Sequence, residues 1–248
     1  MTSIQRVIGV SLACGLLASI VAVPSALAET ARDQDEGGAY VSVSGGLTHP
    51  LGQTDIQGSL SAGTVAIPFV GSATFKTGWD GRLALGYEEL VDVDEGADAL
   101  DHRVPRYRVE VEGLMLRAKR ASFTAGALNV VPNDQLSANV LFANGYLHLL
   151  GKGTARLWAG AGIGYASVSL PDARQIASCS CLGPAEGSGL AYQGKVVAEV
   201  RLAPSLLLVT EGAYVNLPGL STAERPVPVA TYAKTRAVTT NVGFRLKF

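Results

Sequence analysis

Apolar and polar positions alternate along most of the chain with a period of two. Between residues 157 and 165, apolar side chains alternate with Trp158 and three glycines. The same alternation returns in segments of about ten residues, separated by stretches rich in Gly, Pro, Ser and Asn. Successive side chains of a strand point to opposite faces, so each segment predicts a strand with one apolar face. Helical periodicity is scarce, which favours an all-β fold.

The spacing of these segments predicts an antiparallel transmembrane β-barrel of eight strands, with ten strands as the alternative. The predicted strands cover residues 39–48, 72–87, 104–118, 136–150, 154–170, 189–202, 206–217 and 232–248. Residues 151–153 and 203–205 are tight turns, whereas 49–71, 119–135, 171–188 and 218–231 are long connections. Short turns on one rim and long loops on the other are typical of bacterial outer-membrane barrels. The long acidic connection 88–103 departs from this scheme, because it lies on the rim of short turns.

The first 28 residues have the pattern of a cleaved signal peptide. Arg6 precedes an uncharged, mostly apolar run, and Ala26 and Ala28 supply the small residues of a cleavage site. The alternative is an uncleaved anchor, since the run is long enough to span a bilayer. We therefore predict a signal peptide at 1–28, an N-terminal extension at 29–38 and a barrel at 39–248. Beyond residue 30 no apolar run is long enough for a membrane-spanning helix.

Composition narrows the possible partners. The chain is 48% hydrophobic and 17% charged, which excludes a disordered protein. Its 20 Lys and Arg residues against 21 Asp and Glu give a formal net charge of −1. A protein without a basic excess is poorly suited to neutralise a phosphate backbone, so we predict no nucleic-acid partner.

Four segments, in order along residues 39–248, carry a resemblance to a known family. They are KTGWDGRLALGY at 76–87, RVEVEG at 108–113, AGAGIGY at 159–165 and GFRLKF at 243–248. Together they resemble the small outer-membrane β-barrels related to the transmembrane domain of outer-membrane protein A and to opacity and surface-antigen proteins. The acidic connection and the loop containing Cys179 and Cys181 depart from the family pattern.

The resemblance implies a location in the outer membrane of a Gram-negative bacterium, with outer-membrane lipid and the barrel-assembly machinery as partners. The ending with Phe244, Leu246 and Phe248 looks like the family's signal to that machinery. The resemblance implies fold and location rather than a particular function, because one fold serves many functions.

The polar positions of the predicted strands share one face, which we assign to the barrel interior. The inward charged residues are Asp80, Arg82, Arg108, Glu110, Glu112, Arg156, Lys195, Glu199, Arg201, Glu211, Arg245 and Lys247, and Asn144, His148 and Asn241 accompany them. A small barrel has room inside for side chains and little more, and an unpaired buried charge is costly. We therefore predict a paired charge network that plugs the lumen. The alternative is a narrow or gated pathway.

Signals for catalysis, metals or cofactors are weak. Hydroxyl and carboxylate partners do not line up in sequence with His49, His102 or His148, so we predict no enzyme. The acidic run from Asp92 to Asp98 loosely resembles a calcium loop but lacks its closing Glu. We predict no metal and no cofactor, and expect a solvated acidic turn.

The cysteines predict a covalent link and the long loops predict contacts with a partner. Cys179 and Cys181 predict a small loop disulfide in an oxidising compartment, with a soft metal ion as the alternative ligand. Apolar residues at 65–70 and 226–229 could meet a host surface, an envelope polymer or a partner protein. We predict a structural or adhesin-like surface role, with a small channel and a lipid-modifying enzyme as alternatives.

Two substitution expectations depend on the inward and outward assignment. Glu88 lies in the acidic connection by this scheme, so its neutralisation should leave stability unchanged. Gly162 faces inward, and a serine at this position should be tolerated where space exists, whereas Ala161 faces the lipid.

Overall fold

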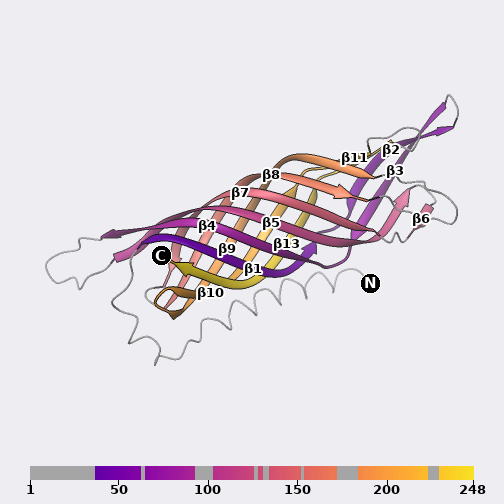
Figure 1. The fold of residues 1–248 in the computed structure, drawn as a ribbon. Helices are drawn as coiled ribbons and strands as arrows, with labels where there is room; N and C mark the ends of the chain where they lie inside the picture. Colours follow the sequence, from indigo (N-terminus) through magenta and orange to yellow (C-terminus); the bar gives the residue numbers. More distant parts are fainter. Residues whose placement is uncertain are drawn as a thin grey trace.

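The computed structural model describes residues 37–62, 65–92, 103–125, 128–130, 134–151, 154–171, 184–222 and 229–248. The described residues form strands joined by short turns (Figure 1). The strands are β1 (Gly38–Pro50), β2 (Thr54–Ala62), β3 (Val65–Phe75), β4 (Gly78–Asp92), β5 (Arg103–Ala125), β6 (Leu128–Val130), β7 (Gln135–Leu150), β8 (Ala155–Leu170), β9 (Ala185–Ala203), β10 (Leu206–Leu217), β11 (Leu220–Thr222), β12 (Val229–Tyr232) and β13 (Thr235–Lys247). Within these ranges, no helix has the length and apolar character needed to cross a bilayer.

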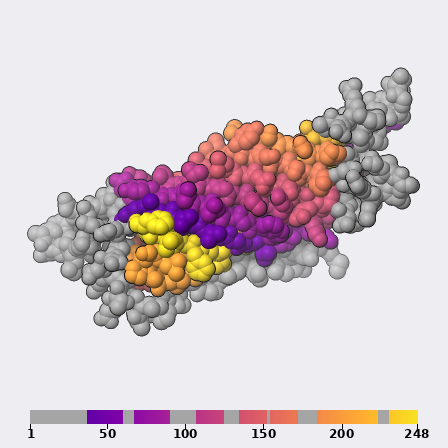
Figure 2. Space-filling model, in the orientation of Figure 1, coloured from indigo at the N-terminus to yellow at the C-terminus, as the bar shows by residue number. Residues whose placement is uncertain are grey.

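Eight of the described strands pair side by side into a closed ring. The order around the ring is β1, β4, β5, β7, β8, β9, β10 and β13, and every pairing is antiparallel. The ring closes where β13 pairs with β1, and their yellow and indigo residues lie side by side on the surface in Figure 2. The predicted all-β antiparallel barrel is therefore confirmed.

The strands of the ring are staggered. Following paired residues once around from Leu190 leads back to β9 at Val200, ten residues further along the strand. Such a stagger tilts the strands relative to the barrel axis, and about eight tilted strands enclose a space that side chains can fill. The inward residues are therefore the contents of the lumen.

The outer wall of the ring carries the apolar members of each alternating pair. Leu83, Leu141 and Ile163 are 59%, 61% and 61% exposed, while their sequence neighbours point into the barrel. Exposed aromatic residues border this apolar surface toward both rims. They are Trp79, Tyr165, Tyr192 and Tyr214 on one side and Tyr87, Tyr107, Phe244 and Phe248 on the other. An apolar belt between aromatic borders is typical of a barrel surrounded by lipid.

The two rims differ in construction. We call the rim with the short connections β7–β8 and β9–β10 the turn rim, and the opposite rim the loop rim. At the loop rim, four neighbouring strands are interrupted and then continue as further strands. The interruptions are residues 51–53 between β1 and β2, 76–77 between β3 and β4, 218–219 between β10 and β11, and 233–234 between β12 and β13.

The barrel wall continues beyond these interruptions. β4 pairs with β5 as far as Trp79 and Arg117, and β3 then takes the same edge of β5 from Phe75 and Arg120 onward. β11 replaces β10 beside β9 in the same way, and β12 and β2 complete the wall. In Figure 1, β2 and β3 project beyond the ring. We call β2, β3, β6, β11 and β12 the loop-rim extension.

Several predicted boundaries are wrong at this rim. The predicted loops 49–71 and 218–231 contain β2, most of β3, β11 and part of β12, and the predicted strand 72–87 is interrupted at 76–77. β5 also continues to Ala125 at this rim, and at the turn rim β4 extends into the predicted acidic connection as far as Asp92. The physical reason is that each interruption is short, so the backbone groups beyond it pair again rather than stay without partners.

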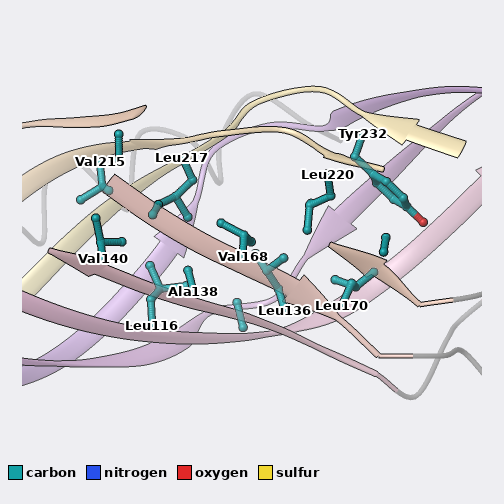
Figure 3. Close-up of a cluster of buried hydrophobic side chains, with 14 of the residues drawn as sticks. Leu116, Leu136, Ala138, Val140, Val168, Leu170, Val215, Leu217, Leu220 and Tyr232 are labelled. Atoms are coloured by element: carbon teal, nitrogen blue, oxygen red, sulfur yellow. The ribbon is translucent and has the colours of Figure 1, made fainter. Parts of the chain in front are cut away.

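The interior is divided into a polar half and an apolar half. Near the turn rim it holds the charged side chains, whereas toward the loop rim it holds a large apolar cluster (Figure 3). Leu116, Val140, Val168 and Leu217 belong to this cluster, and Ile56 and Tyr232 extend it into the loop-rim extension. Toward the loop rim the inward side chains are therefore apolar, and the prediction of a charge network in the lumen did not include this layer.

Some expectations concern residues outside the described ranges. These are the signal peptide at 1–28, nearly all of the extension at 29–38, the cysteines Cys179 and Cys181, and Asp94 and His102 of the acidic connection.

Gly162 of β8 faces the lumen without the space that a serine needs. A side chain there would collide with the amide of Asn144, which is held by a hydrogen bond from Gln193 of 2.8 Å and donates one of 3.1 Å to Glu110. We expect Gly162→Ser to lower the free energy of unfolding by about 1 to 3 kcal/mol, as overpacking does. Urea titration of the refolded protein measures this.

The matched control is Gly194→Ser. Gly194 is exposed on the outer wall, and a side chain there would meet nothing within 4 Å. This variant should keep the wild-type unfolding midpoint. Equal midpoints for both variants would contradict the packing of Asn144 over Gly162.

Candidate functional site

The charged side chains of the lumen form the candidate site. All of the predicted inward charged residues are buried except Lys247, which is partly exposed at the turn rim. Every strand of the ring contributes at least one polar member, because period-two alternation turns every second side chain inward. The structure brings these residues together into connected groups.

Arg82 of β4 is the centre of the group nearest the apolar half. Its guanidinium donates to Asp80 at 3.2 Å, to Glu112 at 2.8 Å and to the Thr239 hydroxyl at 2.8 Å. Asn241 donates a further hydrogen bond to Asp80 at 2.6 Å. The Arg82 charge is thus balanced by carboxylates from two neighbouring strands.

Lys195 of β9 connects this group to the opposite wall. Its ammonium forms ion pairs with Glu112, with Glu211 at 3.1 Å and with Glu110 at 3.9 Å. Three carboxylates from two strands therefore share one amine across the lumen.

Arg108 of β5 is the centre of the group nearest the turn rim. It donates to both oxygens of Glu199, at 2.7 and 2.9 Å, and to Glu88 at 2.9 Å. Its guanidinium carbon lies 3.9 Å from the ring centroid of Trp158, whose indole N–H donates to Glu199 at 3.1 Å. Paired donors and a stacked ring suit the planar geometry of arginine.

Arg245 of β13 connects the group around Arg108 with the group around Lys195. It forms ion pairs with Glu199 and, at 3.4 Å, with Glu110. Its guanidinium lies 4.2 Å from the ring centroid of Tyr40, and the Tyr40 hydroxyl donates to Glu110 at 2.9 Å. Tyr146 donates to the same carboxylate at 2.8 Å.

Glu88 corrects an expectation. It is fully buried and accepts from Arg108 at 2.9 Å, Arg156 at 2.9 Å and Lys247 at 3.0 Å, so it is a member of the network and not of a solvated turn. The many acidic residues of this segment indicated a solvated turn, although Glu88 has the same parity as the inward Asp80 on β4. Arg201 is buried at this rim as well, where its backbone N–H donates to Thr154 at 2.8 Å.

The sequence analysis did not identify other members of the network, because it selected charged residues and these members are aromatic or uncharged. Tyr40 and Tyr146 lie over Gly86 and Gly160 of the neighbouring strands, where a side chain would collide with the tyrosine ring. Each glycine therefore makes room for a ring on the adjacent strand. The sequence does place glycines on the inward face. Which tyrosine each glycine makes room for can be read only once the strand pairing is known.

The chemistry that this arrangement can perform is limited. Among the described residues, no group of three or more His, Cys, Asp or Glu side chains could hold a metal ion. His148 packs edge-on against Trp158, with ring centroids 5.1 Å apart. His49 does have a hydroxyl partner, Thr77, at 3.1 Å on the exposed loop rim, but no carboxylate hydrogen bond to this histidine is found within the described ranges.

A separate buried ion pair lies at the loop rim and contacts the loop-rim extension. Arg120 of β5 is paired with Asp134, and it donates to the Tyr232 hydroxyl of β12 at 3.1 Å. Burial raises the pKa of the Tyr232 hydroxyl, so this group stays protonated at neutral pH. The contact fastens β12 to the start of β7 and to β5.

Comparison with known proteins agrees with this geometry at the level of the fold. No protein-family model matches the chain, and no curated protein matches its sequence. The outer membrane protein OprG from Pseudomonas aeruginosa is 14% identical with a TM-score of 0.57, and the match covers 87% of this chain and 98% of that chain. Neisserial surface protein A, NspA, is 16% identical with a TM-score of 0.48, over 85% of this chain and 97% of that chain.

The likeness to OprG shows the fold of this chain. It is that of the small outer-membrane β-barrels, as the sequence resemblance predicted.

Glu88 and Glu89 provide a matched test of the network. Glu88→Gln removes the carboxylate charge that faces three cations, and we expect a loss of about 3 to 5 kcal/mol in the free energy of unfolding. Glu89 is exposed on the outer wall, so Glu89→Gln should leave the unfolding midpoint nearly unchanged. Urea titration in the same lipid or detergent compares the two, and equal midpoints would show that Glu88 is solvated.

Proposed function

We propose that this chain is an integral outer-membrane protein of a Gram-negative bacterium, with a lumen closed by its own side chains and a structural or adhesin-like surface role without catalysis. The observation that carries this proposal is the connected charge network around Arg108, Lys195 and Arg82, whose charged groups pair with one another. A site for a substrate or a permeating ion would need polar groups that are available to it.

The outer wall supports the membrane location. Its apolar side chains lie between two borders of exposed aromatic residues, the arrangement that a bilayer requires of a barrel. Phe244, Leu246 and Phe248 are exposed on this wall at the end of the chain, beside the closure of β13 with β1. This position suits a signal that the barrel-assembly machinery reads before the ring closes.

The loop-rim extension supports the surface role. The β2–β3 hairpin projects from the barrel, and its side chains Ile67 and Val70 are 51% and 72% exposed. An apolar, exposed hairpin held on a rigid wall is suited to contact a host or envelope ligand. Inward packing of Ile56 and Tyr232 holds the extension in place.

Closure of the lumen is tested by conductance. We expect the protein in planar bilayers to show no steady conductance at the nanosiemens scale, because paired side chains occupy the lumen. The same sample should show different gel mobility before and after boiling, since an intact barrel resists detergent. Steady conductance would overturn the closed lumen, and a soluble protein with unchanged mobility would overturn the barrel location.

Ala161 tests the placement of the wall in lipid. It is exposed near the middle of β8, so Ala161→Arg should cost about 2 to 4 kcal/mol of unfolding free energy in bilayers. Ala161→Leu adds bulk without charge and should be tolerated. Equal stability of the two variants in lipid vesicles would contradict a lipid-facing Ala161.

A further inference from the structure

The outer wall carries a one-sided group of cations at the loop rim. Among the side chains whose exposure the structure describes, the lysines and arginines outside the lumen all gather there. They form the basic patch, which consists of Lys76, Arg117, Lys119, Lys234 and Arg236. Four of these side chains are exposed and Arg117 is half-buried. The patch lies beside the interruptions of neighbouring strands.

Backbone pairing places these cations close together. The Lys76 N–H donates to the Lys119 carbonyl at 2.8 Å, and Arg117 lies opposite Trp79. On the other side of β1, the Leu51 N–H donates to the Arg236 carbonyl at 2.8 Å. Strands of a sheet are about 4.8 Å apart, so the patch spans roughly 15 Å across β13, β1, β4 and β5.

The patch lies just beyond the aromatic border of the apolar belt. Trp79 and Tyr214 belong to that border, and Tyr214 pairs with Val238, two residues along β13 from Arg236. Long cationic side chains at this depth can extend their charged ends to the level of lipid headgroups.

Within the described residues, these cations have no ion pair with a carboxylate, whereas the cations of the lumen do. Arg117 donates to the Leu116 carbonyl at 3.3 Å. Asp55 is the exposed acid beside Lys234, since its carbonyl accepts from Ala233 at 2.8 Å. The opposite wall presents Ser137, Ser167, Ser188 and the exposed acid Glu186 near this rim instead.

We propose that the basic patch binds the phosphate groups of outer-leaflet lipid headgroups, and so gives the barrel a preferred lipid neighbour on one side. The inference rests on the proposed membrane location. Its chemistry is charge complementarity, because lysine and arginine donate strong hydrogen bonds to phosphate oxygens. The opposite wall carries the exposed acid Glu186 and no cation among the side chains whose exposure the structure describes, so it has no such preference.

Fluorescence of Trp79 tests the proposal. Trp79 is 49% exposed beside the patch, whereas Trp158 is fully buried in the lumen and does not contact lipid. The protein is reconstituted into phosphatidylcholine vesicles that contain brominated phosphatidic acid or brominated phosphatidylcholine, and the quenching gives the relative association constant of the two lipids. The patch variant replaces all five cations with Gln, and the control variant is Ser137→Gln/Ser167→Gln/Ser188→Gln.

We expect the wild type and the control to favour phosphatidic acid about fivefold, since one exposed ion pair changes an equilibrium by up to about that factor. The patch variant should lose this preference. An unchanged preference in the patch variant would overturn the proposal. The preference should fall more in inorganic phosphate than in NaCl of equal ionic strength, because free phosphate competes for the same cations. An equal fall in both salts would overturn recognition of the phosphate group.

The proposed membrane location has a separate readout in the same experiment. If neither brominated lipid quenches Trp79, the wall does not face a bilayer, and the patch proposal fails together with the membrane location. Quenching without preference in the wild type would overturn the patch alone.

Discussion

Closure of the strands into a ring is the constraint on which the rest of the structure depends. A ring of about eight strands has an interior of roughly the size that side chains fill, and a buried charge without a partner is costly there. Glu88 with three cations and Lys195 with three carboxylates are consequences of this requirement. The glycines beneath Tyr40 and Tyr146 are a further consequence, because each tyrosine ring occupies the space that a side chain on the glycine would need.

The charge network also favours closure of the ring in one strand register. Arg108 on β5 needs Glu88 from β4 and Glu199 from β9, and Arg245 on β13 needs Glu110 from β5. Glu88 lies directly opposite Arg108 on the neighbouring strand, whereas Glu199 and Glu110 meet their arginines across the lumen. The contacts across the lumen need the ring to have formed in one register. A slip of one residue would turn the inward charges toward lipid and bring the apolar wall inside. The charges thus disfavour incorrect pairings, while the apolar half and the loop-rim extension share one core.

Alternation was sufficient to predict the barrel and the inward charges, because the period of a strand assigns each side chain to a face. It was not sufficient for Glu88, whose acidic neighbours resembled a solvated turn although its parity matched Asp80. It also missed β2 and β3, since turn-forming residues there resembled a loop, and Gly162, since its space is occupied by Asn144 from the next strand. Features that depend on which strands are neighbours cannot be obtained from one strand alone.

The inward and outward faces of the barrel wall therefore contribute in different ways. Inside, charges are matched and buried, so a change such as Glu88→Gln affects the stability of the barrel. Outside, the cations of the basic patch have no ion pair with a carboxylate within the described residues and lie at the border of the apolar belt, so their removal should change which lipid adjoins the protein and leave the fold intact. The loop-rim extension shares its apolar core with the barrel and lies toward the other end of the lumen from the charge network, so the proposed ligand contact there is separate from the lumen charges. The exposed residues of the extension can therefore vary without affecting the ion pairs inside the barrel.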